Sequence, residues 1–361
     1  SGITKLRVSG TEERAFDVWA REFAEKKRVN YKARLLDNVM ESFNAAFPIL
    51  ASMVIFAWVV LKSTHEFSTG SFIAFNAAYT SFQGALLQMS LALTSVLNVV
   101  PLFERARPIL ETRPEVDLTK ADPGLLSGEI EISHVNFRYE TDGPVILYDV
   151  SVHVKPGEFL AVVGTSGSGK STLLRLLLGF DAPESGTIYY DRQDLATLDI
   201  QKVRRQLGVV LQNGHVMPGT LLKNIIGTSR LTVDDAWEAA RMVGFDEDIR
   251  NMPLGMYTVL GADGPTLSGG QRQRLLLARS IVRRPRILFF DEATSALDNR
   301  TQAVVSESLD GIQATRIVIA HRLSTIVNAD HIVVIEKGRI VESGTYKELL
   351  EKGGVFAELA K

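Results

Sequence analysis

The sequence predicts an all-α membrane segment with two long helices, followed by an α/β domain with a parallel core sheet, an antiparallel β subdomain and a helical subdomain. Three observations predict this fold class. Two long stretches without a formal charge lie near the start of the chain, at 42–61 and 67–103. After residue 128, short apolar runs typical of buried strands alternate with helical patterns. A glycine-rich turn at 164–169 joins one such strand to a helix, as in α/β domains.

The two charge-free stretches are predicted membrane spans. Residues 42–61 supply 20 residues, enough helix to cross about 30 Å of hydrocarbon. The second span, at about 71–103, carries polar residues such as Asn76 and Gln83, which predicts a helix that faces other helices or a water-filled path. The alternative is that one or both stretches are core helices of a soluble domain. Residues 1–41 and the segment after Phe103 are rich in Lys and Arg, whereas the short connection at 62–66 has a single Lys. We therefore expect that connection to lie outside the cell.

The first predicted helix is longer than its membrane span. Ser9 and Glu12 have the spacing of a capping box, and Phe16, Trp19 and Phe23 follow at helical spacing. A helix that runs from about residue 10 through the first span has some 50 residues and a length of ~75 Å, more than twice the membrane core. We therefore expect much of this helix to project into the cytoplasm.

A linker is predicted between the two parts of the chain, at 104–127, because three prolines stand there among alternating charges. The second domain is predicted to span 128–361. Acidic and apolar residues alternate at 129–132, and the alternation slips near 133–134 before it resumes, as at a β-bulge. This pattern indicates an antiparallel region at the start of the second domain.

The glycine-rich turn fits the phosphate-binding pattern G-x-x-x-x-G-K-[ST] at every fixed position. The run 159–163 before it predicts a buried strand and 171–178 after it predicts a helix, which is the context that the motif requires. Lys170 would reach the outer phosphates of a nucleotide, and the Ser171 hydroxyl would bind Mg²⁺. The alternative is a chance glycine and serine turn. The nucleotide-binding residues predicted here are Gly164, Thr165, Ser166, Gly167, Ser168, Gly169, Lys170, Ser171 and Thr172.

A second anion site is predicted between Gln212 and Ile287, where the pattern is mostly helical. Thr232 and Asp235 mark one helix start in this subdomain, and a second helix is predicted over 271–279. The residues that open the second helix would bind an anion at its N-terminus. Because the chain has a single glycine-rich phosphate loop, this site is expected to complete the nucleotide site of another copy, with ATP between the two. The residues of this second site are Leu267, Ser268, Gly269, Gly270 and Gln271.

Two acids end the apolar strand predicted over 287–292. Asp291 suits Mg²⁺ coordination, and Glu292 suits polarising the water that attacks the nucleotide. Adjacent residues on a strand point in opposite directions, so the two acids can take different roles. A further strand at 316–320 delivers His321 at its end, where it could contact the γ-phosphate; a lone histidine of this kind is more often a structural residue.

These segments, in their order and spacing, resemble the ATP-binding cassette (ABC) family over about residues 128–361. The resemblance implies an ATPase of the P-loop NTPase class with ATP and Mg²⁺ as its cofactors. It makes 267–271 the signature and His321 the switch histidine. It makes Gln212 the Q-loop residue, which would act both in catalysis and at the metal. The other catalytic residues would be Glu292, His321 and Lys170, and the other metal ligands would be Ser171 and Asp291. It also makes Asp298 the D-loop aspartate, and Tyr139 the aromatic residue that stacks on adenine; alone, Tyr139 is more often a core aromatic.

The membrane part resembles exporters of this family, most of all the permease/ATPase proteins of NHLM-type bacteriocin systems. The resemblance rests on 2–7, 12–16, 43–48 and 101–106. It implies that 1–103 is the C-terminal part of an exporter membrane domain, with two of six helices, so we predict truncation. The implied protein is a multi-pass protein of the cell membrane, in contact with lipid, with its nucleotide domain in the cytoplasm. It would pair with a second copy or a homologous half-transporter and export a bacteriocin-like or leader-bearing peptide.

Other functions share the cassette. A lipid or drug exporter is the alternative among transporters, and a soluble ABC ATPase of DNA repair or translation is the alternative of another class. The two charge-free spans argue against the soluble class. A catalytically silent cassette is disfavoured because Lys170, Asp291, Glu292 and His321 are all present.

Composition narrows the partners. Lys and Arg number 40 and Asp and Glu 42, so the net charge of −2 gives no electrostatic case for nucleic-acid binding. Without cysteine the chain has no disulfide and no thiolate metal site. One departure from the family pattern stands before the signature, where peptide and lipid exporters usually have two glutamates and this chain has Val259 and Ala262. Either a charged contact with the membrane domain has become apolar there, or the two changes are ordinary sequence drift on a surface loop.

Overall fold

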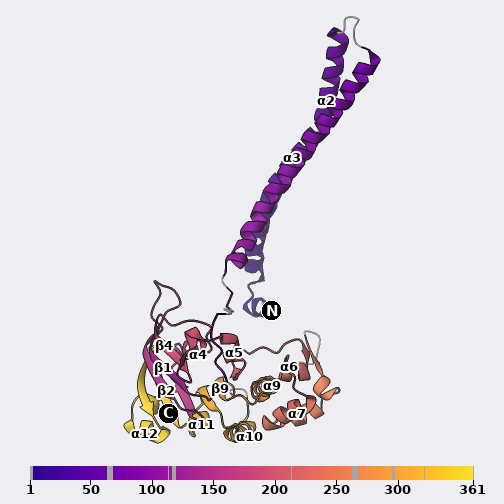
Figure 1. Cartoon of the computed structure of the whole chain (residues 1–361). Helices are drawn as coiled ribbons and strands as arrows, with labels where there is room; N and C mark the ends of the chain where they lie inside the picture. Colours follow the sequence, from indigo (N-terminus) through magenta and orange to yellow (C-terminus); the bar gives the residue numbers. More distant parts are fainter. Residues whose placement is uncertain are drawn as a thin grey trace. The chain divides into compact units, whose positions relative to one another are not determined.

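The chain forms two compact units, Ser1–Arg113 and Pro114–Lys361 (Figure 1). The computed structural model describes residues 3–62, 68–112, 114–115, 119–212, 214–261, 267–294, 297–320 and 322–360.

The first unit is all helical, with one short and two long helices: α1 Ile3–Ser9, α2 Glu12–Lys62 and α3 Thr69–Glu111. The predicted capping box at Ser9 is wrong. Ser9 is the last residue of α1, and its hydroxyl donates to the Lys5 carbonyl oxygen at 2.8 Å. Gly10 follows with a φ of 59°, a left-handed conformation that ends α1 before α2 begins.

Helix α2 is long and apolar enough to cross a membrane, with a mean hydropathy of 2.1 over its most apolar 18 residues, none of them buried. Among the described residues, α2 is the one helix that is both long and apolar enough to do so. The second predicted span falls within α3 and stays a prediction. The rings of Phe56 on α2 and Phe72 on α3 meet edge to face, with centroids 4.9 Å apart.

Helix α3 continues eight residues into the predicted linker, through residues 104–111. Pro101 and Pro108 lie inside it. An internal proline costs a helix about 3 kcal/mol, and a helix of this length can carry that cost. Proline content alone therefore places the start of the linker too early.

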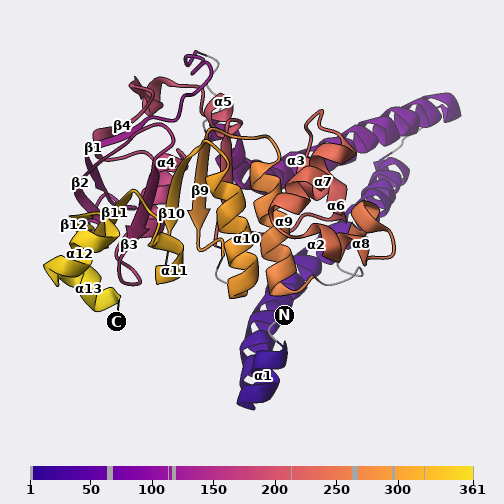
Figure 2. The same ribbon diagram turned by 90° about the horizontal axis from the view of Figure 1, so that it is seen from below.

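The second unit is built on a six-stranded sheet in the order β12-β11-β3-β10-β9-β6 (Figure 2). Every neighbouring pair is parallel except the edge pair of β11 and β12. The predicted parallel core sheet is confirmed. The six strands are β3 Phe159–Val163, β6 Leu207–Val210, β9 Ile287–Asp291, β10 Thr315–Ile319, β11 His331–Glu336 and β12 Arg339–Gly344.

Alternate side chains of the central strands enter two separate cores. Phe159, Ala161 and Val163 of β3 enter one core, while Leu160 and Val162 enter the other. Because both faces are covered, β3 and β9 are buried along their whole length, which is why they read as continuous apolar runs in the sequence. Helices packed with this sheet include α4 Lys170–Leu177, α5 Ile200–Arg204, α10 Asn299–Asp310, α11 Leu323–Ile326, α12 Tyr346–Lys352 and α13 Val355–Leu359.

The predicted antiparallel subdomain is a four-stranded sheet in the order β2-β1-β4-β5. Its register shifts between Ile132 and Val135, where the alternation of the sequence slips, so the predicted bulge is confirmed. His134 lies inside the bulge with a φ of 50°. The strands are β1 Ile130–Phe137, β2 Leu147–Val154, β4 Ser185–Tyr190 and β5 Gln193–Asp194, followed by the short helix η1 Leu195–Thr197.

The helical subdomain lies beyond the β6 edge of the sheet, on the side away from α12 (Figures 1 and 2). The predicted helix start at Thr232 is confirmed, because Thr232 and Asp235 form a capping box at α7. The elements here are β7 Gly219–Thr220, α6 Leu221–Ile226, α7 Val233–Met242, α8 Asp246–Arg250, η2 Gly255–Tyr257, β8 Val259–Leu260 and α9 Gly269–Ile281.

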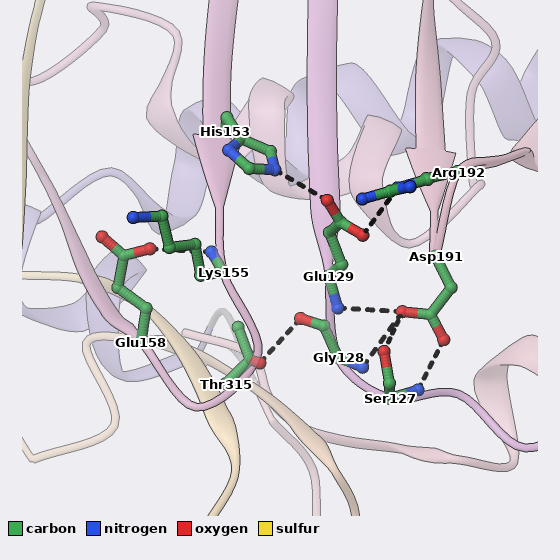
Figure 3. Close-up of polar contacts among 9 residues, drawn as sticks. All are labelled: Ser127, Gly128, Glu129, His153, Lys155, Glu158, Asp191, Arg192 and Thr315. Atoms are coloured by element: carbon green, nitrogen blue, oxygen red, sulfur yellow. Dashed lines mark hydrogen bonds and ion pairs between the residues drawn. The ribbon is translucent and has the colours of Figure 1, made fainter.

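The entry of the chain into β1 is held in place from two sides (Figure 3). The Asp191 carboxylate accepts hydrogen bonds from the Ser127 amide and hydroxyl, and from the Gly128 and Glu129 amides. On the other side, the buried Thr315 hydroxyl donates to the Gly128 carbonyl oxygen at 2.7 Å. The last residues before β1 are therefore part of the domain.

Candidate nucleotide-binding site

The glycine-rich loop connects β3 to α4 and requires its glycines. Gly164 has a φ of 152°, and a Cβ there would lie 2.1 Å from the Ile335 carbonyl oxygen. Gly169 has a φ of 108°, and a Cβ there would lie 2.8 Å from Leu147. Gly167, between them, has a φ of 80°. The backbone can therefore curl around a phosphate at the start of α4 only with glycine at these places.

Lys170 lies across this loop. Its Nζ donates to the carbonyl oxygens of Gly164 and Thr165, both at 2.8 Å. Burial lowers the pKa of the Lys170 amine, while the charges of Asp291 and Glu292 act in the opposite direction. A buried cation held over the loop by two backbone carbonyl oxygens is suited to bind the outer phosphates of a nucleotide.

The predicted metal ligands of α4 and β9 lie together. The Ser171 hydroxyl is 3.3 Å from Oδ2 of Asp291, whose residue is 6% exposed at the end of β9. A hydroxyl and a carboxylate are oxygen ligands of the kind that Mg²⁺ prefers, and Mg²⁺ keeps its other positions for phosphate oxygens and water. Nearby, the Ser168 hydroxyl is buried without a hydrogen-bond partner. These residues fit a phosphate-bound Mg²⁺.

Glu292 is held in an unusual backbone conformation by contacts from three elements. Its φ is 53°, in the left-handed region that non-glycine residues rarely adopt. Its amide donates to the Ile319 carbonyl oxygen of β10 at 3.1 Å, and its own carbonyl oxygen accepts from Nε2 of Gln273 at 2.9 Å. Its carboxylate accepts from Nε2 of Gln212 at 3.1 Å. Gln212, the predicted Q-loop residue, and Glu292, the predicted catalytic carboxylate, are therefore direct neighbours, and the metal role of Gln212 stays a prediction.

Ser268 is the N-cap of α9. Its hydroxyl accepts from the Gln271 amide at 3.2 Å, and Oε1 of Gln271 accepts from the Ser268 amide at 3.0 Å, which forms a capping box. Nε2 of Gln271 also donates to Asp248, which pairs with Arg274 at 2.8 Å. Leu267 is buried in the core, so the cap is anchored from behind. The amides at the start of this 13-residue helix are thereby held at a fixed position.

Tyr139 and Asp298 are further predicted nucleotide-binding residues that the structure describes. The Tyr139 ring is 55% exposed and packs edge to face on Phe137, and its hydroxyl lies 3.1 Å from the Thr172 hydroxyl, at the start of α4. It is placed to offer a ring face beside the phosphate loop. Asp298 is the N-cap of α10 and binds the Thr301 amide and hydroxyl. His321 and Ala262 lie outside the described residues, while Val259 is an exposed residue of β8.

A cleft of about 430 Å³ brings the Q-loop, the end of β9 and the start of α9 together in one chain. Gln273 lines it and was missed by the sequence reasoning, because no phosphate-binding or acid–base pattern includes it. The signal available in the sequence was its place one turn into a helix that must pack against the strand bearing Glu292. The cleft is lined by residues that include Gln212, Gly214, Gly269, Arg272, Gln273 and Glu292.

A phosphate loop after β3, two acids at the end of β9, two strands away in the same sheet, and a second helix N-terminus in a separate helical subdomain define an ATP-binding domain of the transporter ATPases. Residues 147–295 match the family model described as ABC transporter. This region of the chain belongs to the ABC transporter family, and here the ATP-binding domain is fused to a helical membrane segment.

The relatives are toxin exporters. The chain is 40% identical over 305 residues to the alpha-hemolysin translocation ATP-binding protein HlyB of Escherichia coli O157:H7, covering 83% of this chain and 43% of the relative. It is 34% identical over 360 residues to the leukotoxin export ATP-binding protein LtxB of Aggregatibacter actinomycetemcomitans, covering 98% and 51%. The chain spans about half the length of the curated relatives it matches.

A solved structure of a bacterial Atm1-family ABC exporter with ATP bound has the same fold. Its TM-score is 0.87 at 31% sequence identity, and the match covers 99% of this chain and 64% of that one. Because the match includes the N-terminal helices as well as the nucleotide domain, the predicted exporter fold is confirmed.

Proposed function

We propose that this chain is part of an ABC exporter in which two copies, or this chain and a homologous half-transporter, close on two ATP molecules. The observation that carries the proposal is the joint arrangement of Lys170, Glu292 and Ser268. Lys170 begins α4 and Glu292 follows β9, both next to the core sheet, whereas Ser268 caps a helix of the other subdomain. Each ATP would lie between the phosphate loop of one copy and the α9 N-terminus of its partner.

The chemistry follows from the residues around Glu292. Lys170 and the loop amides would stabilise the charge that develops on the transferred phosphate. The Glu292 carboxylate would orient the attacking water and accept its proton, with the Gln212 amide fixing the direction of that carboxylate. Mg²⁺, when bound by Ser171 and Asp291, would neutralise phosphate charge. Asp298, Tyr139 and His321 keep their predicted roles at the D-loop, the adenine and the γ-phosphate.

The exported cargo is proposed from the similar proteins and from the membrane part of the chain. The relatives are named for the translocation or export of protein toxins, and the membrane part of this chain resembles bacteriocin exporters. Both favour a peptide or protein over a lipid or drug. The exposed apolar length of α2 favours a place in the cell membrane, with lipid against it and with the nucleotide domain in the cytoplasm.

The test measures ATP hydrolysis by the protein in lipid vesicles, with a leader-bearing peptide, a lipid or a hydrophobic drug added in turn. We expect the peptide alone to raise turnover, and the Glu292→Gln variant to show no response. Stimulation by the lipid or drug alone would make the alternative exporter the better account. Release of the protein from membranes by a carbonate wash would instead favour the soluble class.

A further inference from the structure

The conformation of Glu292 depends on the helix that carries the second anion site. A non-glycine residue keeps a left-handed φ only where its surroundings impose it. At Glu292 the amide is held by β10, and the carbonyl oxygen accepts a hydrogen bond from Nε2 of Gln273, on α9, at 2.9 Å. Gln273 is therefore one of the groups that determine the direction in which the Glu292 side chain leaves the backbone.

Helix α9 moves as one rigid element, so a shift of its N-terminus also moves Gln273. Leu275, Leu277 and Ala278, which follow Gln273, are fully buried in the core, and the capping box of Ser268 and Gln271 makes its first turn regular. Gln273 lies five residues after Ser268, on the same rigid element. A shift of the helix N-terminus therefore changes the distance from Gln273 to the Glu292 carbonyl oxygen.

Within the proposed dimer, the N-terminus of α9 and Glu292 of the same copy would contact different ATP molecules. Ser268 of one copy would contact the ATP held by the partner, whereas Glu292 of the same copy would act on the ATP held by its own Lys170. We infer that Gln273 is a positioning residue that couples the partner's nucleotide site to the geometry of Glu292. This inference rests on the proposed dimer and adds a specific route between its two sites.

The experiment compares ATP hydrolysis and ATP binding in the full chain and in Gln273→Met, which keeps the side-chain length and removes the donor. We expect the wild type to hydrolyse ATP with a Hill coefficient between 1 and 2, as for two coupled sites. In Gln273→Met we expect kcat to fall about 10-fold, the equivalent of one lost hydrogen bond, at unchanged ATP affinity, with a Hill coefficient of about 1. Gln273→Asn, whose donor is too short to reach, should behave in the same way.

Gln193→Met is the matched control, because Gln193 also donates to a backbone carbonyl oxygen, that of Pro123, in the antiparallel subdomain. It should leave kcat and the Hill coefficient unchanged. A wild-type Hill coefficient of 1, or variants with the cooperativity of the wild type, would overturn the inference. So would equal losses of ATP affinity and kcat, which indicate a merely structural role. Absence of any ATP hydrolysis in the wild type would instead refute the proposed function itself.

Discussion

Replacing Asp191 tests how firmly residues 127–129, which lead into β1, are fixed to the nucleotide domain. Asp191 and Arg192 form the two-residue turn between β4 and β5, with φ values of 48° and 63°, as a type I′ hairpin requires. The Asp191 carboxylate accepts four hydrogen bonds from Ser127, Gly128 and Glu129 (Figure 3). Asp191→Ala removes all four and places alanine in a left-handed conformation.

The expected cost follows from these contacts. Each hydrogen bond to a charged acceptor contributes about 1.5–3 kcal/mol when buried and less where water can replace it, as at this half-exposed site. The left-handed alanine adds about 1 kcal/mol. We therefore expect Asp191→Ala to lower the free energy of unfolding by about 2–4 kcal/mol, a fall in Tm of roughly 4–16 °C for a domain of this size. Asp191→Asn keeps one acceptor oxygen and tolerates the left-handed φ, so its loss should be about half as large.

The assay is urea unfolding of the full chain, followed by circular dichroism, with thermal melting as a second measure. Asp142→Ala, on the exposed connection between β1 and β2, is the control and should change the free energy of unfolding by less than about 0.5 kcal/mol. An Asp191→Ala variant as stable as this control would show that the clamp contributes nothing and would refute the reasoning.

Two further predictions concern charged residues of the second unit. Arg192→Gly should raise the stability by about 0.5 kcal/mol in the same urea assay, because glycine relieves the left-handed φ. The ion pair with Glu129 that is lost is 3.4 Å long and its Arg192 side chain is 84% exposed, so the pair contributes little. A net loss of stability would contradict this prediction. The hydrogen bond from Arg204 lowers the pKa of Glu115 below its ordinary value of 4.5, so its stabilisation is present above that value and is lost as pH falls through the lowered pKa. Glu115→Gln should therefore weaken the dependence of stability on pH between about 5 and 3, and an unchanged slope would show that the pair has no effect.

Much of the fold could be predicted from the sequence because local patterns determine it. The run 159–163 is buried on both faces and the glycine pattern after it has one structural solution, so the strand, the loop and the helix were all placed correctly. The bulge at 133–134 and the capping box at Thr232 were also predictable, since each depends on neighbours in sequence.

Contacts between distant segments were not predictable. Gln273 and Glu292 are 19 residues apart, and their hydrogen bond exists only because α9 packs beside β9. Asp191 contacts residues more than 60 positions earlier through the pairing of β1 with β4. The end of α1 at Ser9 depended on the left-handed Gly10, which competes with the capping pattern and prevails.

The central claim is that Glu292 performs ATP hydrolysis at a site built by Lys170, Ser171 and Asp291. The measurement that tests it most directly compares ATP binding and ATP turnover in the wild type and in Glu292→Gln, which keeps the size of the side chain and its contact distance to Gln212. We expect Glu292→Gln to bind ATP with an affinity within about twofold of the wild type and to lose turnover by at least about 100-fold, the usual range for a lost general base. Near-normal hydrolysis by Glu292→Gln would show that another group activates the water.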